Sequence, residues 1–335
     1  MSLPTLLFSV PGTQLSFRAN ITVANPFVDD LVQQLPLKSV LGHVVISGQT
    51  FWFPTRILSL GPRNMIEREL GAVYLNAPGL TICVCYGAIT ESAKVNQFGR
   101  VLQEDLSKLQ AIGEVVYQQT VASEDKAIVG IEVSLIGGDE NGNRSLVKEL
   151  APHPPMAEGD WRVVKALIEK EIDLAWLEEP DEFRKVRLGM IEGGAGTGNQ
   201  SFSVLVHLET FLMMDGAHIL FRILQLTRDA SMTLSQIKNM TRVFLSTTFD
   251  HFAFLADLGL PTLRRVGDAY FRALDTIKSK DEYVELTGSL LVFVVRMRCW
   301  LHLIFPWHLG KHFPHRAPDA IEGLPKLPAY SASSI

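Results

Sequence analysis

The sequence has few cysteines and no excess of basic residues. Only three cysteines occur among 335 residues: Cys83 and Cys85 lie close together, and Cys299 lies far from both. An odd number without ligand-like spacing argues against a disulfide framework. The 31 basic and 36 acidic residues leave a formal charge of −5, which lacks the electrostatic footprint of a nucleic-acid-binding protein. We therefore expect a cytoplasmic setting and no nucleic-acid partner.

Uninterrupted apolar runs are also missing. The most apolar stretch, GSLLVFVVRMRCWLHLIFPW (288–307), contains Arg296 and Arg298, whereas a membrane span needs about 20 mostly apolar residues. The N-terminal run LLFSV (6–10) is too short for a signal peptide. We expect a buried helix at 288–307 and no membrane partner.

Motifs for nucleotides, metals and serine nucleophiles are absent. GGAGTGNQS (193–201) has no Walker lysine, and Asn199 stands where a dinucleotide fingerprint needs its third glycine. This stretch is typical of a flexible connector, or alternatively of a lid. His308 and His312 share a helical face, but Pro314 ends any helix there. We predict neither a cofactor nor a metal.

Short strands separated by turns dominate the first half of the chain. With 47% hydrophobic residues, 335 residues suffice for two domains with buried cores. β-branched and aromatic runs bounded by Gly, Pro or Asn predict strands at 6–10, 15–21, 40–46, 51–58, 72–75, 80–86, 115–118 and 128–135. Helical periodicity predicts helices at 26–35 and 97–112. Many short strands with two brief helices favour a closed or nearly closed β-barrel.

The second half of the chain is helical. Pro152, Pro154 and Pro155 mark a boundary, and we predict domains at 1–145 and 146–335. An amphipathic helix at 160–177 connects or covers the halves, followed by helices at 204–227, 233–258, 261–278 and 281–305. Their short connections favour an antiparallel bundle. The predicted fold class is therefore α+β, with a small β-barrel followed by an all-α helical bundle.

The barrel half contains polar residues among aromatics. His43 and Ser47 lie four apart in a strand-like run and would share a face, followed by Trp52 and Arg56. Such a face could line a pocket, and a satisfied core histidine is the alternative for His43. Glu69 and Glu67 would share a face if extended, where like charges raise one carboxyl pKa toward that of a general base. A solvated turn is the alternative.

A second polar group follows the strand that ends at Tyr86. Glu91, Asn96 and Arg100 come within the next loop and helix start, and loops on a rigid scaffold often carry function. Tyr86 could donate a proton, and Arg100 could hold a carboxylate through two hydrogen bonds. Asn96 could equally be a helix cap.

The helical half contains two further candidates. His218 forms a stripe with Asp215 and Arg222 in an otherwise apolar helix. The stripe could be the roof of a site, a subunit contact or a structural network. Lys165 lies one turn after Trp161 and would have a lowered pKa if desolvated, although an exposed lysine is the default.

Several runs resemble known proteins. Ala24-Asn25-Pro26, LPL (35–37), GHVVISGQTFWFP (42–54), YGAITES (86–92) and NQFGRVLQEDLSKL (96–109) resemble a bacterial family of cyclophilin-like small β-barrel proteins. That resemblance covers roughly residues 4–137. Joined to a helical bundle at roughly 150–315, the whole chain resembles the cucumopine and mikimopine synthase family.

This resemblance implies condensation of L-histidine with 2-oxoglutarate in a Pictet–Spengler-type cyclisation. No hydride is transferred, which agrees with the missing dinucleotide fingerprint. Three substrate carboxylates call for cations, with Arg56, Arg100 and Lys165 as candidates, and proton transfer calls for His43, Glu69, Tyr86 or Glu91. Trp52, Asn96 and His218 would complete a site on the barrel that the bundle covers.

The sequence is also compatible with functions other than a synthase. Cyclophilin-like barrels also occur as ligand binders and peptidyl-prolyl isomerases, although an isomerase signature is missing. The helical half could instead be a dimerisation element of a non-catalytic sensor, and we expect a homo-oligomer through that half.

Overall fold

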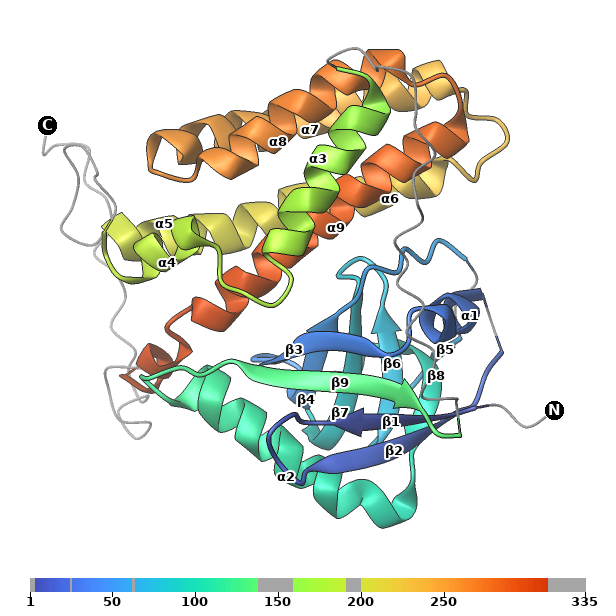
Figure 1. The fold of residues 1–335 in the computed structure, drawn as a ribbon, viewed down its shortest axis with the longest axis vertical. Coiled ribbons are helices and arrows are strands. Elements are labelled where there is room, and N and C mark those ends of the chain that lie inside the picture. The colour runs from blue at the N-terminus through green and yellow to red at the C-terminus, as the bar shows by residue number, and fades with distance from the viewer. Residues whose placement is uncertain (1–3, 25, 62–63, 138–158, 191–199, 313–335) are drawn as a thin grey trace, which may run out of the picture.

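The N-terminal half of the chain forms a β-barrel, and helices stand on one side of it (Figure 1). A computed structural model describes residues 4–24, 26–61, 64–137, 159–190 and 200–312. The strands are β1 (Thr5–Ser9), β2 (Ser16–Ile21), β3 (Leu37–His43), β4 (Gly48–Pro54), β5 (Met65–Ile66), β6 (Ala72–Asn76), β7 (Thr81–Ile89), β8 (Val95–Val101) and β9 (Val129–Leu135). This architecture confirms the predicted fold class.

Eight antiparallel strands close the barrel. They are ordered β2-β1-β9-β3-β4-β7-β6-β8, and the pairing of β2 with β8 completes the ring, while β5 adds to the edge of β8. Closure satisfies the backbone hydrogen bonds that an open sheet leaves at its edges.

Alternation along β4 separates an inner from an outer face of the barrel. Phe51 lies opposite His43 and Val84, whereas Trp52 lies opposite Gly42 and Cys83. Since cross-strand partners share a face, His43 belongs to the inner face with Phe51 and Trp52 to the outer face. Inside, Phe8 stacks on Phe17 with ring centroids 4.6 Å apart, and both contact the inner phenylalanines of β4.

Two helices pack on the barrel: α1 (Pro26–Gln33) and α2 (Leu106–Tyr117), the latter between the 3₁₀ turn η1 (Gln103–Asp105) and the π turn η2 (Gln118–Ala122). The predicted helix at 97–112 is wrong at its start, because 97–101 belongs to β8. The strand is buried on both faces, so its apolar spacing imitates a helix. The strand predicted at 115–118 is also wrong, because those β-branched residues lie in α2 and η2.

The second half contains α3 (Trp161–Leu174), α4 (Asp181–Arg187), α5 (Gln200–Thr210), η3 (Phe211–His218), α6 (Ile219–Leu226), α7 (Leu234–Asp257), α8 (Pro261–Ala273), η4 (Leu274–Thr276), α9 (Lys280–Ile304) and η5 (Trp307–His312). The predicted helices are confirmed in outline, and α4 was not predicted. Helix 204–227 divides into α5, the π-helical η3 and α6, and the helix predicted at 261–278 ends as α-helix at Ala273.

Helix α9 is the central element of the bundle. Eighteen of its residues are buried, which confirms the buried helix predicted at 288–307, except that the α-helix ends at Ile304. Arg296 is fully buried, its guanidinium lies over the rings of Trp176 and Trp300, and its Nε donates to the Ala175 carbonyl at 2.8 Å.

Two described helices are long and apolar enough to cross a membrane by length and composition alone. The most apolar window of Lys280–Ile304 is 89% buried in the protein, and that of Phe202–Leu226 is 44% buried. The extent to which α9 is buried is typical of a core helix.

The absence of membrane and nucleic-acid partners stays a prediction, as does the homo-oligomer.

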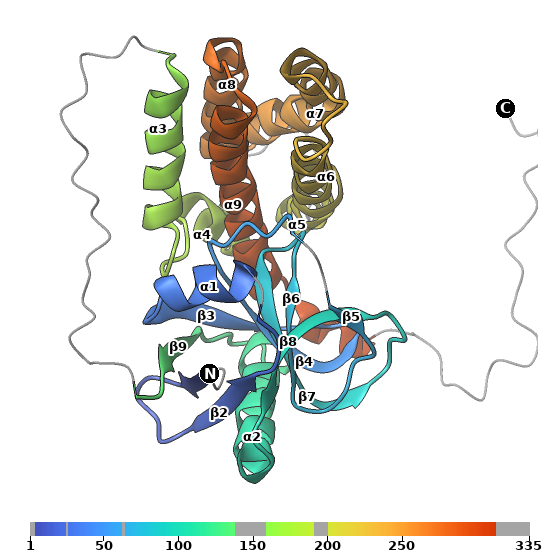
Figure 2. The same ribbon diagram turned by 90° about the vertical axis from the view of Figure 1, so that its right-hand side faces the viewer.

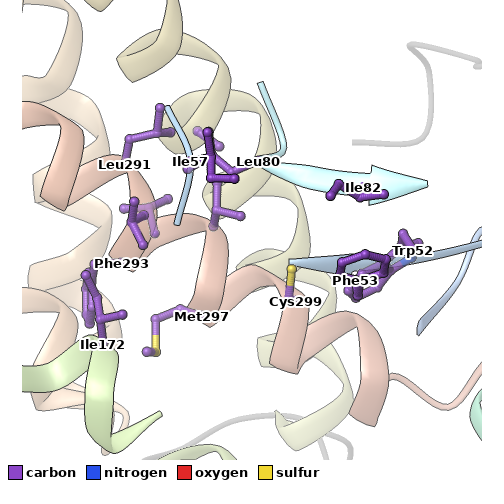
Figure 3. Close-up of a cluster of buried hydrophobic side chains, with 14 of the residues drawn as sticks. Trp52, Phe53, Ile57, Leu80, Ile82, Ile172, Leu291, Phe293, Met297 and Cys299 are labelled. Atoms are coloured by element: carbon purple, nitrogen blue, oxygen red, sulfur yellow. The ribbon is translucent and has the colours of Figure 1, made fainter. Parts of the chain in front are cut away.

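Barrel and bundle share one hydrophobic core. Figure 3 shows Trp52, Ile57 and Leu80 of the barrel in one cluster with Leu291 and Cys299 of α9. Figure 2 shows the bundle standing above the barrel, with the lower end of α9 reaching it. The predicted domain boundary, the connector at 193–199 and the tail after Pro314 lie outside the described residues.

Gly113 of α2 provides a test of the barrel packing. A Cβ at this position would lie 2.2 Å from the Tyr86 ring. Alanine normally stabilises a helix interior by about 1 kcal/mol over glycine, but overpacking a core costs about 1–3 kcal/mol. We therefore expect Gly113→Ala to lower the free energy of unfolding by about 1–2 kcal/mol in urea titration. Gly61→Ala, which meets open space, is the control, and an equal or higher stability of Gly113→Ala would contradict this packing.

Candidate functional site

A cavity of about 590 Å³ lies between the outer face of the barrel and the bundle. Its barrel wall includes Trp52, Cys83 and Tyr74, which the strand register places side by side on β4, β7 and β6. The bundle wall includes Glu209 at the end of α5 and Arg298 and His302 near the end of α9, one helical turn apart. This volume is within the range of about 300–1,000 Å³ that is usual for small-molecule sites.

Arg68 is the main cation of the barrel wall. Its side chain is only 6% exposed, its Nη2 lies 3.2 Å from Glu91 Oε2, and its guanidinium lies over the Tyr74 ring. Its Nε and Nη1 are buried and make no hydrogen bond to any described residue. A buried guanidinium with unused donors is suited to a carboxylate ligand, because arginine forms strong paired hydrogen bonds with carboxylates.

Asn96 holds the segment that carries Arg68. Its Oδ1 accepts a hydrogen bond from the Asn64 backbone N–H at 2.7 Å, and the Asn64 side chain donates to the Gln97 carbonyl at 3.1 Å. The short strand β5 pairs with β8 directly beyond this point. Asn96 is therefore a positioning residue in β8, and its predicted alternative role as a helix cap is wrong.

Glu209 is the carboxylate of the bundle wall. Its Oε1 lies 3.4 Å from both Arg298 Nη2 and His302 Nδ1. Burial alone would raise the pKa of Glu209, but the hydrogen bond from His302 and the charge of Arg298 outweigh it and hold the pKa below its ordinary value. Glu209 Oε2 and Arg298 Nε are buried and have no hydrogen-bond partner in the described part of the chain.

His302 is held from several sides. Its Nε2 lies 2.9 Å from the His43 carbonyl, and its ring meets the Trp52 ring edge to face and lies beside Trp307. Trp307 Nε1 in turn donates to the His302 carbonyl at 2.8 Å. Gly42 makes room for Trp52, since a Cβ there would lie 2.3 Å from the indole ring. The imidazole is thus fixed in one orientation against the barrel.

The charges around the cavity favour an anionic ligand. Arg68, Lys94 and Arg298 line the cavity together with two carboxylates, Glu91 beside Arg68 and Glu209 beside Arg298. Three cations against two anions leave positive charge for a ligand carboxylate, and the aromatic rings around them reduce water access. No group of three or more histidine, cysteine or acidic residues arranged to hold a metal occurs among the described residues.

Three of the predicted site residues, Trp52, Glu91 and Asn96, line the cavity. Ser47 also lines it, but from the connection after β3 rather than from a strand shared with His43. Cys83 and Cys85 share the outer sheet face with Trp52, and burial raises the pKa of the Cys83 thiol to about 12, so this thiol does not ionise near neutral pH.

His43 and Tyr86 lie on the inner face of the barrel instead. A hydrogen bond of 2.8 Å joins His43 Nε2 to the Tyr86 hydroxyl, and Tyr117 of α2 packs on the imidazole. Burial lowers the pKa of His43 to about 4 and raises that of Tyr86 to about 12. The structure favours the core alternative for His43, since its side chain is not among the residues that line the cavity.

The other predicted residues also lie outside the cavity lining. Glu69 and Arg100 pair with each other at 2.7 Å, Arg56 pairs with Asp173 at 2.6 Å, and Lys165 pairs with Glu169 at 2.8 Å. His218 lies in η3, where burial, with the nearby charges of Arg298 and Arg222, lowers its pKa.

Four residues that line the cavity were not predicted as site residues: Arg68, Glu209, Arg298 and His302. Arg298 and His302 carry the same signal as the stripe at 215–222, namely polar residues four apart in an apolar helix. Arg68 carries no such signal, because it lies in an irregular segment between β5 and β6.

The fold and the cavity define a barrel-and-bundle protein with a cavity between its two halves. Residues 161–304 match the cucumopine synthase C-terminal helical bundle domain. The helical half of the chain is therefore a domain of that family.

The solved structure of another protein, McbB, shares the architecture of this chain. McbB, solved in complex with tryptophan, has a TM-score of 0.79 and 23% sequence identity, over 92% of this chain and 99% of that one. The hypothetical protein AF2241 from Archaeoglobus fulgidus has a TM-score of 0.30 and 18% identity, over 41% of this chain and 98% of that one. A comparison with curated proteins gave no match. The likeness to McbB shows the fold, a β-barrel followed by a helical bundle.

The buried His43 predicts an acid-sensitive fold. Its folded pKa of about 4 lies below the ordinary 6.5, so the unfolded chain binds the proton more readily. Stability is then complete above pH 6.5 and is lost as pH falls toward 4, by up to about 3 kcal/mol. We expect His43→Gln, which can keep a hydrogen bond to Tyr86, to flatten the dependence of unfolding free energy on pH between 7 and 4. Equal slopes for both proteins would contradict the buried neutral imidazole.

Proposed function

We propose that the protein is a Pictet–Spengler-type synthase that condenses L-histidine with 2-oxoglutarate, without a redox cofactor, in the cavity between barrel and bundle. The main support for this proposal is the environment of Arg68. Its guanidinium is buried beside Glu91, two of its donor atoms have no hydrogen-bond partner among the described residues, and the cavity around it has aromatic walls. The cucumopine synthase type of helical domain supports histidine and 2-oxoglutarate as the reactants.

The reaction makes three physical demands on a site. The amine of one substrate must add to the ketone of the other and lose water to give an imine. A carbon of the imidazole ring must then attack the imine, and the ring must lose the proton on that carbon to become aromatic again. The site must therefore bind several carboxylates, exchange protons and hold the reactants in line.

The cavity walls meet the demand for binding. Arg68 and Lys94 on the barrel and Arg298 on the bundle are available to the substrate carboxylates. Trp52, Tyr74 and Trp307 provide flat walls against which an aromatic side chain can pack. That McbB was solved with tryptophan, an aromatic amino acid, supports a ligand of this kind in the shared fold.

Glu91 is placed to free the amine. An amino acid enters as an ammonium ion, which must lose a proton before its nitrogen can attack a ketone. Glu91 lines the cavity and pairs with Arg68, so it lies beside the group that would hold a substrate carboxylate. It can accept the ammonium proton at that point, which keeps one of the roles expected from the sequence.

The direct test is product formation. Purified protein incubated with L-histidine and 2-oxoglutarate, without nicotinamide, should yield a compound with their combined mass less one water in mass spectrometry. Absence of product above an enzyme-free control would contradict the synthase. Calorimetric binding of L-histidine without product would instead favour the ligand-binding alternative.

Substitution of Arg68 and of Arg100 tests which arginine binds the substrate carboxylate. We expect Arg68→Met to raise the KM for 2-oxoglutarate about 10- to 100-fold, since hydrogen bonds to a charged group contribute about 1.5–3 kcal/mol. Arg100→Met is the matched control, because Arg100 pairs with Glu69 outside the cavity lining, and its steady-state kinetics should stay within about twofold. A larger effect at Arg100 than at Arg68 would place the carboxylate site elsewhere on the barrel.

A further inference from the structure

The hydrogen bond between His302 and β3 fixes one proton on the imidazole. His302 Nε2 lies 2.9 Å from the backbone carbonyl of His43. A carbonyl oxygen only accepts hydrogen bonds, so Nε2 must carry a hydrogen. In a neutral His302 the other nitrogen, Nδ1, would then be an acceptor without a proton.

The second imidazole nitrogen, His302 Nδ1, lies next to the carboxylate of Glu209. Its Oε1 lies 3.4 Å from His302 Nδ1, and an ionised carboxylate also only accepts hydrogen bonds. Two acceptors in contact repel each other unless a proton lies between them. Arg298, which lies 3.4 Å from the same oxygen, favours the ionised carboxylate, so the proton belongs on the imidazole.

The other carboxylate oxygen is left for the cavity. Glu209 lines the cavity, and its Oε2 is buried without a hydrogen-bond partner among the described residues. The pair therefore has a proton on the His302 side and an unused acceptor on the ligand side. Because His302 is held between Trp52 and Trp307, this arrangement exists before substrate binds.

We propose that Glu209 and His302 form the proton-exchanging pair of this synthase, with Glu209 as the catalytic residue and His302 as its positioning residue and proton store. The inference rests on the proposed function. It assigns the proton transfers of two later steps, the loss of water and the loss of the ring proton, to this pair.

After Glu91 has taken the ammonium proton, the amine adds to the ketone carbon and its N–H proton moves to the ketone oxygen, which gives the carbinolamine. The pair, through Glu209, gives a proton to the hydroxyl of the carbinolamine, whose C–O bond breaks to release water and leave an iminium ion. An imidazole carbon of the substrate attacks the iminium carbon and forms the C–C bond. Glu209 then takes the proton from that ring carbon, which restores aromaticity and returns the pair to its starting state. The product amine takes back the proton from Glu91 at the end of the cycle. The sum is amine plus ketone giving product plus water.

Other charges face the pair and will contribute to its pH profile. Arg298 lies on α9 beside it, Arg68, Glu91 and Lys94 lie across the cavity on the barrel, and the His43 imidazole lies behind it in β3. The tests therefore compare variants of the pair with the unchanged protein under the same conditions.

The first test needs no catalysis. In the full chain labelled with ¹⁵N-histidine, the His302 ring signals are identified by their loss in His302→Gln. We expect both ring nitrogens of His302 to carry a proton at neutral pH, and only Nε2 to do so in Glu209→Gln. A His302 ring with a bare Nδ1 at neutral pH in the unchanged protein would overturn the proposal.

The second test measures turnover. We expect Glu209→Gln to lower kcat about 10²- to 10⁴-fold with a KM for 2-oxoglutarate within a few fold. L-histidine deuterated on its ring carbons should react more slowly than ordinary L-histidine in this variant, because ring-proton loss becomes limiting. Glu285→Gln, an exposed glutamate on α9, is the matched control with unchanged kinetics. His302→Gln should shift the pH profile of kcat.

The outcomes separate the two proposals. Unchanged kcat in Glu209→Gln, with product still formed, would overturn the role of the pair and leave the synthase standing. Absence of product from the unchanged protein, together with a doubly protonated His302, would contradict the proposed synthase function. The predicted protonation of His302 beside Glu209 would still hold.

Discussion

The burial of α9 is the constraint on which the site depends. A helix enclosed on nearly all sides can rotate or slide very little, because protein interiors are close-packed. Arg296, held between two tryptophans and bonded to the Ala175 carbonyl, fixes its orientation further. Two residues on, Arg298 faces the cavity, and His302 follows one turn later against the barrel. The packing of the bundle therefore sets the position of the polar groups.

The barrel contributes the opposite wall through the alternation of its strands. Phe51 and Trp52 are neighbours in sequence, yet one lies in the aromatic interior with Tyr86 and the other faces the cavity with His302. A shift of one residue in register would exchange these roles. The same alternation gives His43 two functions: its side chain belongs to the barrel core, and its carbonyl orients His302.

The sequence predicted the barrel followed by a bundle, because turn residues and helical periodicity are local signals. It failed at β8, where burial on both faces made Phe98 and Val101 resemble a helical stripe, and at 115–118, where tertiary packing overrode β-propensity. It predicted Trp52 from a strand-like run, and Glu91 and Asn96 from the loop and expected helix start that follow Tyr86. Arg68 and Glu209 were not predicted. They line the same cavity only because the barrel closes and the bundle packs against it. Arg56, Arg100 and Lys165 were predicted as carboxylate-binding cations, and each pairs with an acidic residue outside the cavity lining.

The central claim is that the reactants meet between the outer face of the barrel and the end of α9. A crystal structure of the protein with L-histidine and 2-oxoglutarate tests this most directly. The account predicts electron density beside Trp52, with carboxylates at Arg68 and Arg298 and the Glu209 carboxylate within hydrogen-bond distance of the ligand. Density inside the barrel at His43 and Tyr86, with none between Arg68 and Arg298, would contradict it.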